Sequence, residues 1–87
     1  MFTIKIKRKA LKTLTRINEN QRLKVKSIIL LLKNDPIPLK RADVTKLKGF
    51  NNTYRIRVGT TRIVYEILWN EKTILIHYAG LRKKAYD

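Results

Sequence analysis

The sequence predicts a small α+β domain, with two N-terminal helices packed on one face of a mainly antiparallel sheet. Three observations predict this fold class. Hydrophobic periodicity orders the elements as β-α-α-β-β-β. Helices followed by a run of strands indicate an antiparallel or mixed sheet. The length of 87 residues suits one domain, residues 1–87, with a modest hydrophobic core.

The chain opens with a strand and a first helix. Residues 2–7 alternate apolar and polar side chains, which is the period of a half-buried strand. A helix is expected from Arg8 to about Ile17, because Ala10, Leu11 and Leu14 recur at helical spacing together with Ile17.

A second helix is expected after the polar break at residues 18–20, where Asn18 or Asn20 can serve as its N-cap. It runs to about Lys33, and the prolines that follow prevent its continuation. Residues 28–32 are apolar on all sides, which predicts burial on more than one side, against the sheet and against the first helix or a partner chain. Residues 39–49 form a basic connector to which we assign no element.

Three strands are expected at about 53–58, 61–69 and 72–79. Gly59-Thr60 suits a two-residue type II′ turn, and Asn70-Glu71 is the second predicted turn. The first turn sets the register, with Arg57 opposite Arg62. The same register pairs Ile56 with Ile63 and Tyr54 with Tyr65.

This register puts three arginines on the face away from the helices. We call this face the arginine face and define it by Arg55, Arg57 and Arg62. The core face holds Tyr54, Ile56, Val58, Ile63 and Tyr65, joined by Ile74, Ile76 and Tyr78 of the last strand. Leu75, His77 and Ala79 are expected on the arginine face. Like charges directly opposite each other destabilise a sheet, so we interpret the arginines as a site for an anionic ligand. The alternative is a solvated face partly paired with Glu66.

The net charge of +15 predicts a polyanionic partner: nucleic acid, a nucleic-acid machine or an acidic protein. No residue is cysteine, which excludes disulfides and thiolate metal sites. No apolar run is long enough to span a membrane and no signal peptide is evident, so we expect a cytoplasmic protein. No His, Asp or Glu cluster has metal-ligand spacing and no glycine-rich phosphate loop is present. Any catalysis is therefore expected to need no metal or cofactor.

Few side chains offer other chemistry. Arginine binds phosphate through a planar fork, and Arg82 of the tail can join the three on the sheet. Glu66 is interpreted as a salt-bridge partner of Arg55 or, alternatively, as a general base. His77 is the single histidine and is either structural or functional, and Tyr86 can bring a hydroxyl from the tail.

These residues together resemble a known family. The segments are Lys46-Leu47-Lys48-Gly49, Tyr54-Arg55-Ile56-Arg57, Arg62-Ile63-Val64-Tyr65, Gly80-Leu81-Arg82 and Tyr86. Their order and spacing resemble the RelE toxins of the RelE/ParE superfamily, in particular the small archaeal-type RelE proteins. The resemblance extends over nearly the whole chain.

The resemblance implies a type II toxin that a RelB-like antitoxin holds inactive, in a toxin–antitoxin heterotetramer. RelE-like toxins enter the ribosomal A site and cut mRNA without a metal, by attack of the 2′-hydroxyl on the adjacent phosphate. By position, Arg55 and Arg57 are the basic pair, and Arg62 stabilises the pentavalent phosphate. Arg82 supports it and Tyr86 stacks on or orients the substrate. Lys5, Lys7, Lys46 and Lys48 would contact the ribosomal RNA backbone.

One departure from the family concerns the basic pair, which often contains lysine. Arginine is effectively never deprotonated. The base then lies elsewhere, at Glu66 or His77, or catalysis rests on positioning and charge stabilisation. Two alternatives remain open: a ParE-like toxin that inhibits DNA gyrase, and a non-enzymatic basic protein that binds nucleic acid.

Overall fold

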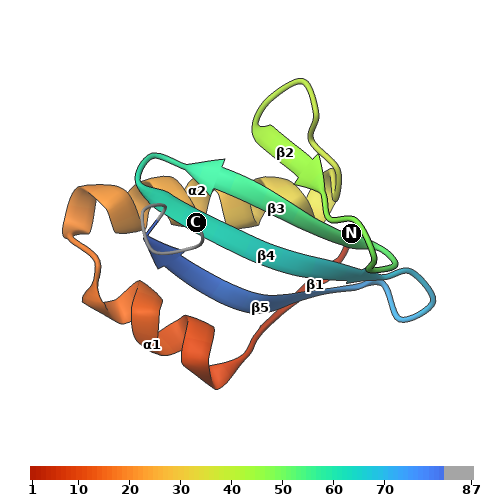
Figure 1. Cartoon of the computed structure of the whole chain (residues 1–87), viewed down its shortest axis with the longest axis horizontal. Helices are drawn as coiled ribbons and strands as arrows, with labels where there is room; N and C mark the ends of the chain where they lie inside the picture. The colour runs from red at the N-terminus through yellow and green to blue at the C-terminus, as the bar shows by residue number, and fades with distance from the viewer. Residues whose placement is uncertain (82–87) are drawn as a thin grey trace.

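A computed structural model of the chain, which describes residues 1–81, contains two helices and one five-stranded sheet (Figure 1). In chain order the elements are β1 (Thr3–Ile6), α1 (Arg8–Arg16), α2 (Glu19–Asn34), β2 (Asp43–Lys46), β3 (Thr53–Val58), β4 (Thr61–Leu68) and β5 (Thr73–Leu81). The predicted α+β class and the predicted succession of elements are confirmed, with one additional strand, β2.

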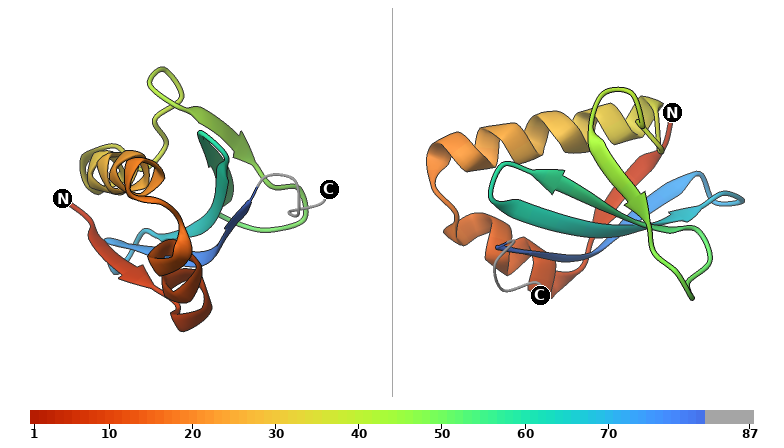
Figure 2. Two further views of the ribbon diagram at one scale, coloured as in Figure 1. Left: turned by 90° about the vertical axis from the view of Figure 1, so that its left-hand side faces the viewer. Right: turned by 45° about the horizontal axis from the view of Figure 1, so that its top comes forward.

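The strand order in the sheet is β1-β5-β4-β3-β2. β1 runs parallel to β5, and the other neighbouring strands are antiparallel. Both helices lie on the same side of the curved sheet, with α1 against β5 and α2 against β3 and β1 (Figure 2). Among residues 1–81, no helix covers the other side of the three central strands, as the sequence predicts.

The junction between the helices is fixed by polar side chains. Asn18 is the N-cap of α2, and its side-chain oxygen accepts a hydrogen bond of 2.8 Å from the backbone N–H of Gln21. The guanidinium of Arg22 donates to the carbonyl oxygens of Leu14, Thr15 and Ile17, which lie at the C-terminus of α1. A cation there is favourable, because the last carbonyls of a helix lack partners within the helix.

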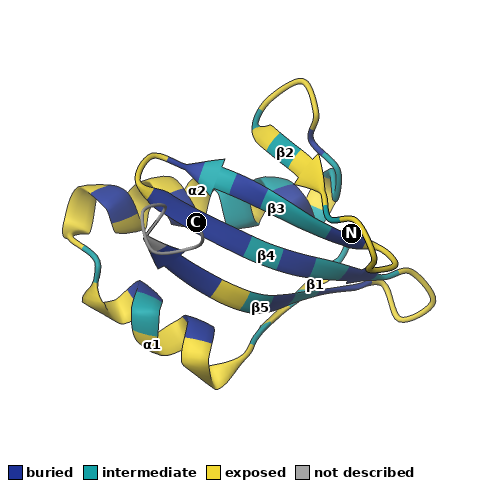
Figure 3. Ribbon diagram, viewed as in Figure 1, coloured by how far each residue is buried: buried dark blue, intermediate teal, exposed yellow. Residues whose placement is uncertain are grey.

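The core lies between the helices and the sheet (Figure 3). Its buried apolar residues are Ala10, Leu14, Val25, Leu32, Ile56, Val58, Ile63, Tyr65, Ile67, Ile74, Ile76 and Ala79. Leu11 shares the predicted apolar spacing of α1 but is half exposed. In the apolar segment of α2 only Leu32 is fully buried, and Leu30 faces solvent. One side of α2 therefore remains without a partner among residues 1–81.

Tyr65 ties the chain after α2 to the core. Its hydroxyl donates a 2.7 Å hydrogen bond to the carbonyl oxygen of Pro36, and its ring stacks on that of Tyr54. Burial, and to a smaller extent Tyr54 and Asp35, raises the pKa of the Tyr65 phenol. The phenol stays protonated and keeps its role as hydrogen-bond donor.

The β3–β4 hairpin has the predicted register. Tyr54 pairs with Tyr65, Ile56 with Ile63, and Arg57 with Arg62. The turn between the strands is Gly59-Thr60, and Gly59 has the positive φ of 60° that the first central position of a type II′ turn requires.

Strand β2 lies within the segment to which the sequence assigns no element. It has four residues and pairs antiparallel with β3, with Asp43 opposite Arg57 and Lys46 opposite Tyr54. A short, charged and largely exposed edge strand carries almost no hydrophobic alternation, so its pattern could not predict it.

The prediction of which β5 side chains face the core is partly wrong. Ile74 and Ile76 are buried as expected, but Ala79 faces the core and Tyr78 is exposed. The cause is an irregularity in the pairing with β4: Tyr65 pairs with Ile76, whereas Val64 pairs with Tyr78, so His77 is an extra residue. A β-bulge of this kind reverses the alternation of all residues after it. Gly80, not Ala79, is therefore opposite Arg62.

The predicted turn at Asn70-Glu71 is also too short. β4 ends at Leu68, which pairs with Thr73, and residues 69–72 form a four-residue connection. Lys72 takes a positive φ of 52° in it. In the part of the chain that the structure describes, neither helix is long and apolar enough to cross a membrane.

We expect Gly59→Ala to destabilise the fold more than Gly49→Ala. Both glycines have positive φ, but a Cβ at Gly59 would lie 2.6 Å from Oε1 of Gln21, whereas a Cβ at Gly49 meets nothing within 4 Å. Gly49→Ala should cost about 1 kcal/mol through backbone strain. Gly59→Ala should cost about 1 kcal/mol more, because the Gln21 amide must move away and its hydrogen bond to the carbonyl oxygen of Val58 is lost. Urea unfolding of both variants measures the difference, and equal losses would contradict the close approach of Gln21.

Candidate anion-binding site on the sheet

The structure brings the three predicted arginines together on the side of the sheet away from the helices. Arg57 of β3 pairs with Arg62 of β4, and Arg55 pairs with Val64 on the same face. Their register neighbours Ile56 and Ile63 are fully buried on the opposite face. Alternation along two paired strands therefore positions the arginine face.

Arg62 is the most enclosed of the three, with 9% of its surface exposed. Arg57 is more open and lies 4.0 Å from the carboxylate of Asp43 on β2. Both partners of that pair are partly exposed, so the pair contributes little to stability. Its larger effect is to place one negative charge at the edge of the arginine face.

Glu66 and His77 form a second polar group on this face. Glu66 lies four residues after Arg62 on β4, and its Oε1 is 2.8 Å from Nε2 of His77 on β5. Both side chains are about one third exposed, at 32% and 30%. The prediction that His77 shares a face with the arginines is confirmed, and the bulge at His77 accompanies its contact with Glu66.

Tyr78 is a member of this face that the sequence analysis placed in the core. Beyond the bulge, its exposed side chain lies along β5 over Gly80, where a Cβ would overlap the Tyr78 hydroxyl. Gly80 is directly opposite Arg62. A phenol therefore stands beside the most buried arginine. The pattern of β5 did not predict it, because a bulge leaves no mark in hydrophobic alternation.

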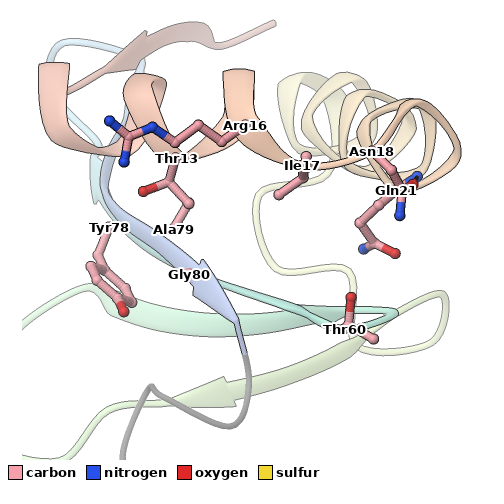
Figure 4. A pocket seen from close by; sticks show the side chains of 9 residues that line it. All are labelled: Thr13, Arg16, Ile17, Asn18, Gln21, Thr60, Tyr78, Ala79 and Gly80. Atoms are coloured by element: carbon pink, nitrogen blue, oxygen red, sulfur yellow. Dashed lines mark hydrogen bonds between the residues drawn. The ribbon is translucent and has the colours of Figure 1, made fainter.

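Two hollows are of similar size, and only the second lies on the side of the arginine face. One, of about 410 Å³, lies at the end of α1 and is lined by Thr13, Arg16, Ile17, Asn18, Gln21, Thr60, Tyr78, Ala79 and Gly80 (Figure 4). Figure 4 shows Tyr78 and the helix residues on opposite sides of β5. The other, also about 410 Å³, is lined by Leu47, Phe50, Asn51, Thr53, Val64, Glu66 and His77. We call it the Glu66 pocket.

The predicted lysines are not gathered at the arginines. Lys5 pairs with Leu75 in β1, two strands away from Arg62, and Lys7 precedes α1. Lys46 pairs with Tyr54 at the opposite edge of the sheet, and with Lys48 it lines a shallow hollow of about 630 Å³. Arg82 and Tyr86 lie outside the described residues.

The chemistry of this face is that of an anion site. Three guanidinium groups supply planar donors for phosphate oxygens, and a phenol and a carboxylate–imidazole pair stand on either side of them. Within residues 1–81, no three carboxylate or histidine side chains come together to form a metal-binding group.

Comparison with known proteins places this chain in a family. Residues 4–85 match the model described as the ParE toxin of the type II toxin–antitoxin system parDE. The chain is 35% identical over 85 residues to RelE1 of Methanocaldococcus jannaschii, covering 98% of this chain and 94% of the relative. It is 45% identical over 47 residues to toxin RelE3 of the same organism, covering 54% of this chain and 51% of that relative.

Solved structures show the same fold. The RelE–RelB complex of Pyrococcus horikoshii contains a chain with a TM-score of 0.85 and 28% identity, covering 97% of this chain and 98% of that one. The RelB–RelE complex of Methanococcus jannaschii gives 0.78 and 31%, covering 95% of each chain. The Escherichia coli RelBE complex gives 0.79 at 18% identity, covering 93% of this chain and 96% of that one, a likeness of fold.

Asp43→Asn should leave the free energy of unfolding within about 0.5 kcal/mol of the parent value, because the pair with Arg57 is long and exposed. It should strengthen the binding of a short single-stranded RNA about two- to threefold, since a competing carboxylate is removed. Glu71→Gln is the control, because Glu71 is exposed in the β4–β5 connection and its loss changes the net charge equally. Urea unfolding and fluorescence anisotropy measure the two quantities. An equal gain in both variants would show that only net charge matters.

Proposed function

This chain belongs to the ParE toxin family of type II toxin–antitoxin systems, and on that premise we propose that it is a RelE-type toxin that cuts mRNA on the translating ribosome. The observation that carries the proposal is the arginine face. Three arginines held together by strand register, against the repulsion of two directly opposite each other, match the need to bind a phosphodiester.

In the proposed reaction, the 2′-hydroxyl oxygen of the substrate attacks the adjacent phosphorus and loses its proton. The bond to the 5′-oxygen of the next nucleotide breaks, and that oxygen gains a proton. The products are a 2′,3′-cyclic phosphate, or a 3′-phosphate after hydrolysis, and a 5′-hydroxyl. The pentavalent intermediate carries more negative charge than the substrate, so fixed guanidinium groups stabilise it preferentially.

Arg62 is the proposed stabiliser of that charge, because it is the most enclosed arginine and loses the most competing water. Arg55 and Arg57 hold the flanking phosphate oxygens, and Tyr78 brings a hydroxyl beside Arg62. Arg82 and Tyr86 are proposed, from the resemblance alone, to support the phosphate and orient the substrate. Lys5, Lys7, Lys46 and Lys48, near the two edges of the sheet, are proposed contacts to ribosomal RNA. Such contacts position a protein without reading sequence.

Arg62→Ala should lower the rate of mRNA cleavage on translating ribosomes about 100-fold or more, which is the usual cost of losing a charge-stabilising donor. Arg62→Lys should recover only part of the rate, because it keeps the charge but not the planar fork. Arg41→Ala, in the exposed connection before β2, removes the same charge elsewhere and should cut normally. Primer extension maps the ends, and thermal unfolding checks that each variant is folded. Undiminished cleavage by folded Arg62→Ala would contradict the mechanism.

The description of the matched family favours one alternative, a ParE-like inhibitor of DNA gyrase. A supercoiling assay separates the two: inhibition of gyrase without cut mRNA would support the alternative. A protein that only binds nucleic acid would show an affinity that falls steeply with salt concentration, and it would produce no cut ends.

We also propose that a RelB-like antitoxin covers the free side of α2 and forms a heterotetramer with this chain. Leu23 and Leu30 lie two helical turns apart on α2 and are 54% and 51% exposed. The solved complexes of similar proteins each pair a RelE chain with a RelB chain. An acidic partner would also offset the net charge of +15.

Leu30→Glu should weaken the complex with an acidic protein encoded beside this gene at least about tenfold, since it puts a charge into an apolar contact. It should change the stability of the free chain little, because Leu30 already faces solvent. Leu39→Glu is the control, as Leu39 is exposed outside the helices. Isothermal titration of both variants gives the affinities, and an equal effect of the two would place the partner elsewhere.

A further inference from the structure

The Glu66 pocket is a hollow beside the arginine face, lined by three strands and one connection. Val64 and Glu66 of β4, Thr53 of β3 and His77 of β5 form one side of it. The β2–β3 connection forms the other side with Leu47, Phe50 and Asn51. Its volume of about 410 Å³ lies in the range of small-ligand sites.

The connection that forms this second side is held in place. Asn52 has a positive φ of 55°, its carbonyl oxygen accepts from the N–H of Ile67 at 2.8 Å, and its side chain accepts from the indole of Trp69 at 3.2 Å. The N–H of Leu47 also donates to the carbonyl oxygen of Thr53. These hydrogen bonds fix the backbone of the connection at Leu47 and Asn52, on both sides of Phe50 and Asn51.

The lining combines apolar side chains with four polar residues, Asn51, Thr53, Glu66 and His77. Leu47, Phe50 and Val64 are apolar, and Phe50 is an aromatic ring with much of its surface exposed. Glu66 uses Oε1 to meet His77, which leaves Oε2 as an acceptor. A flat group with a polar edge fits these features, and an unstacked nucleobase is such a group.

Strand geometry places Glu66 nearer to Arg55 than to Arg62. The Cα atoms of Glu66 and Arg62 are four residues apart along β4, about 13 Å at 3.3 Å per residue. Glu66 is only two residues, about 7 Å, from Val64, which pairs with Arg55. The pocket therefore lies beside the proposed phosphate site. A nucleotide next to the bound phosphate would be able to reach it.

We propose that the Glu66 pocket binds a nucleobase of the RNA next to the cut, with Phe50 stacking on it and Glu66 accepting a hydrogen bond from its exocyclic amino group. His77 positions the Glu66 carboxylate. A carboxylate accepts well from an exocyclic amino group. Uracil has no such group, and its one donor, N3–H, lies between two carbonyl oxygens that a carboxylate repels. Cytosine, adenine and guanine are therefore favoured over uracil. This inference rests on the proposed function.

The test compares Glu66→Gln with the parent protein and with Glu71→Gln, which removes the same charge outside the pocket. Cleavage ends are mapped on translating ribosomes, and base frequencies are counted at the positions flanking the cut. The parent should disfavour uracil at one of these positions about three- to tenfold, the usual effect of one hydrogen bond. Glu66→Gln should abolish that bias, because its amide can also donate, and Glu71→Gln should keep it.

A second measurement keeps the two proposals separate. The isolated protein is titrated with oligocytidylate and oligouridylate by fluorescence anisotropy, and the parent should prefer the first by a similar factor. Phe50→Ala should weaken both about fivefold or more, and Leu39→Ala, an exposed leucine elsewhere, should not. A preference that disappears in Glu66→Gln without any mRNA cleavage by the parent would support the pocket and refute the proposed function.

Two outcomes overturn the inference. One is cleavage by Glu66→Gln with the parent's base frequencies. The other is a uniform loss of rate with a changed pH–rate profile, which would assign Glu66 and His77 to proton transfer. Thermal unfolding of Glu66→Gln and Phe50→Ala ensures that neither result reflects an unfolded variant.

Discussion

The pairing of β3 with β4 is the constraint on which the rest of the molecule depends. Ile56 and Ile63 are opposite each other at the centre of the core, and Arg57 and Arg62 are opposite each other on the reverse face. Because side chains alternate with a period of two, a slip of one residue would expose the isoleucines and bury the arginines. The register that stabilises the fold is therefore also the register that brings the three arginines together, and the turn at Gly59 fixes it.

The extra residue in β5, at His77, determines which side chains of that strand lie on the open side of the sheet. Without the bulge at His77, Tyr78 would lie in the core and Ala79 would face Arg62. With the bulge, the core receives the small Ala79 and the open face receives a phenol, while His77 meets Glu66. Bulges are found near functional sites because they redirect a side chain without breaking the sheet. Here one bulge places Tyr78 beside the arginine face and His77 in the lining of the Glu66 pocket.

The sequence was informative wherever one local pattern determined the outcome. The Gly59 turn and the alternation on both arms predicted the hairpin register, and Asn18 at the polar break predicted the helix cap, although Asn20 was equally possible. The sequence did not predict strand β2, because an exposed four-residue edge strand forms only through its pairing with β3. It did not predict the bulge either, because the position of the bulge depends on how β5 pairs with β4, which is a tertiary property.

The opposition of Arg57 and Arg62 lowers the stability of the sheet. Two arginines in directly opposed positions repel each other, and Arg62 is largely withdrawn from the water that would screen that repulsion. The core on the other side of the same strands must offset this cost. On the proposed function, a phosphate chain over the arginines would offset part of this repulsion and add charge-assisted hydrogen bonds. Any ligand that binds only the folded chain also stabilises it. On that proposal, part of the free energy of RNA binding would come from offsetting the repulsion between Arg57 and Arg62.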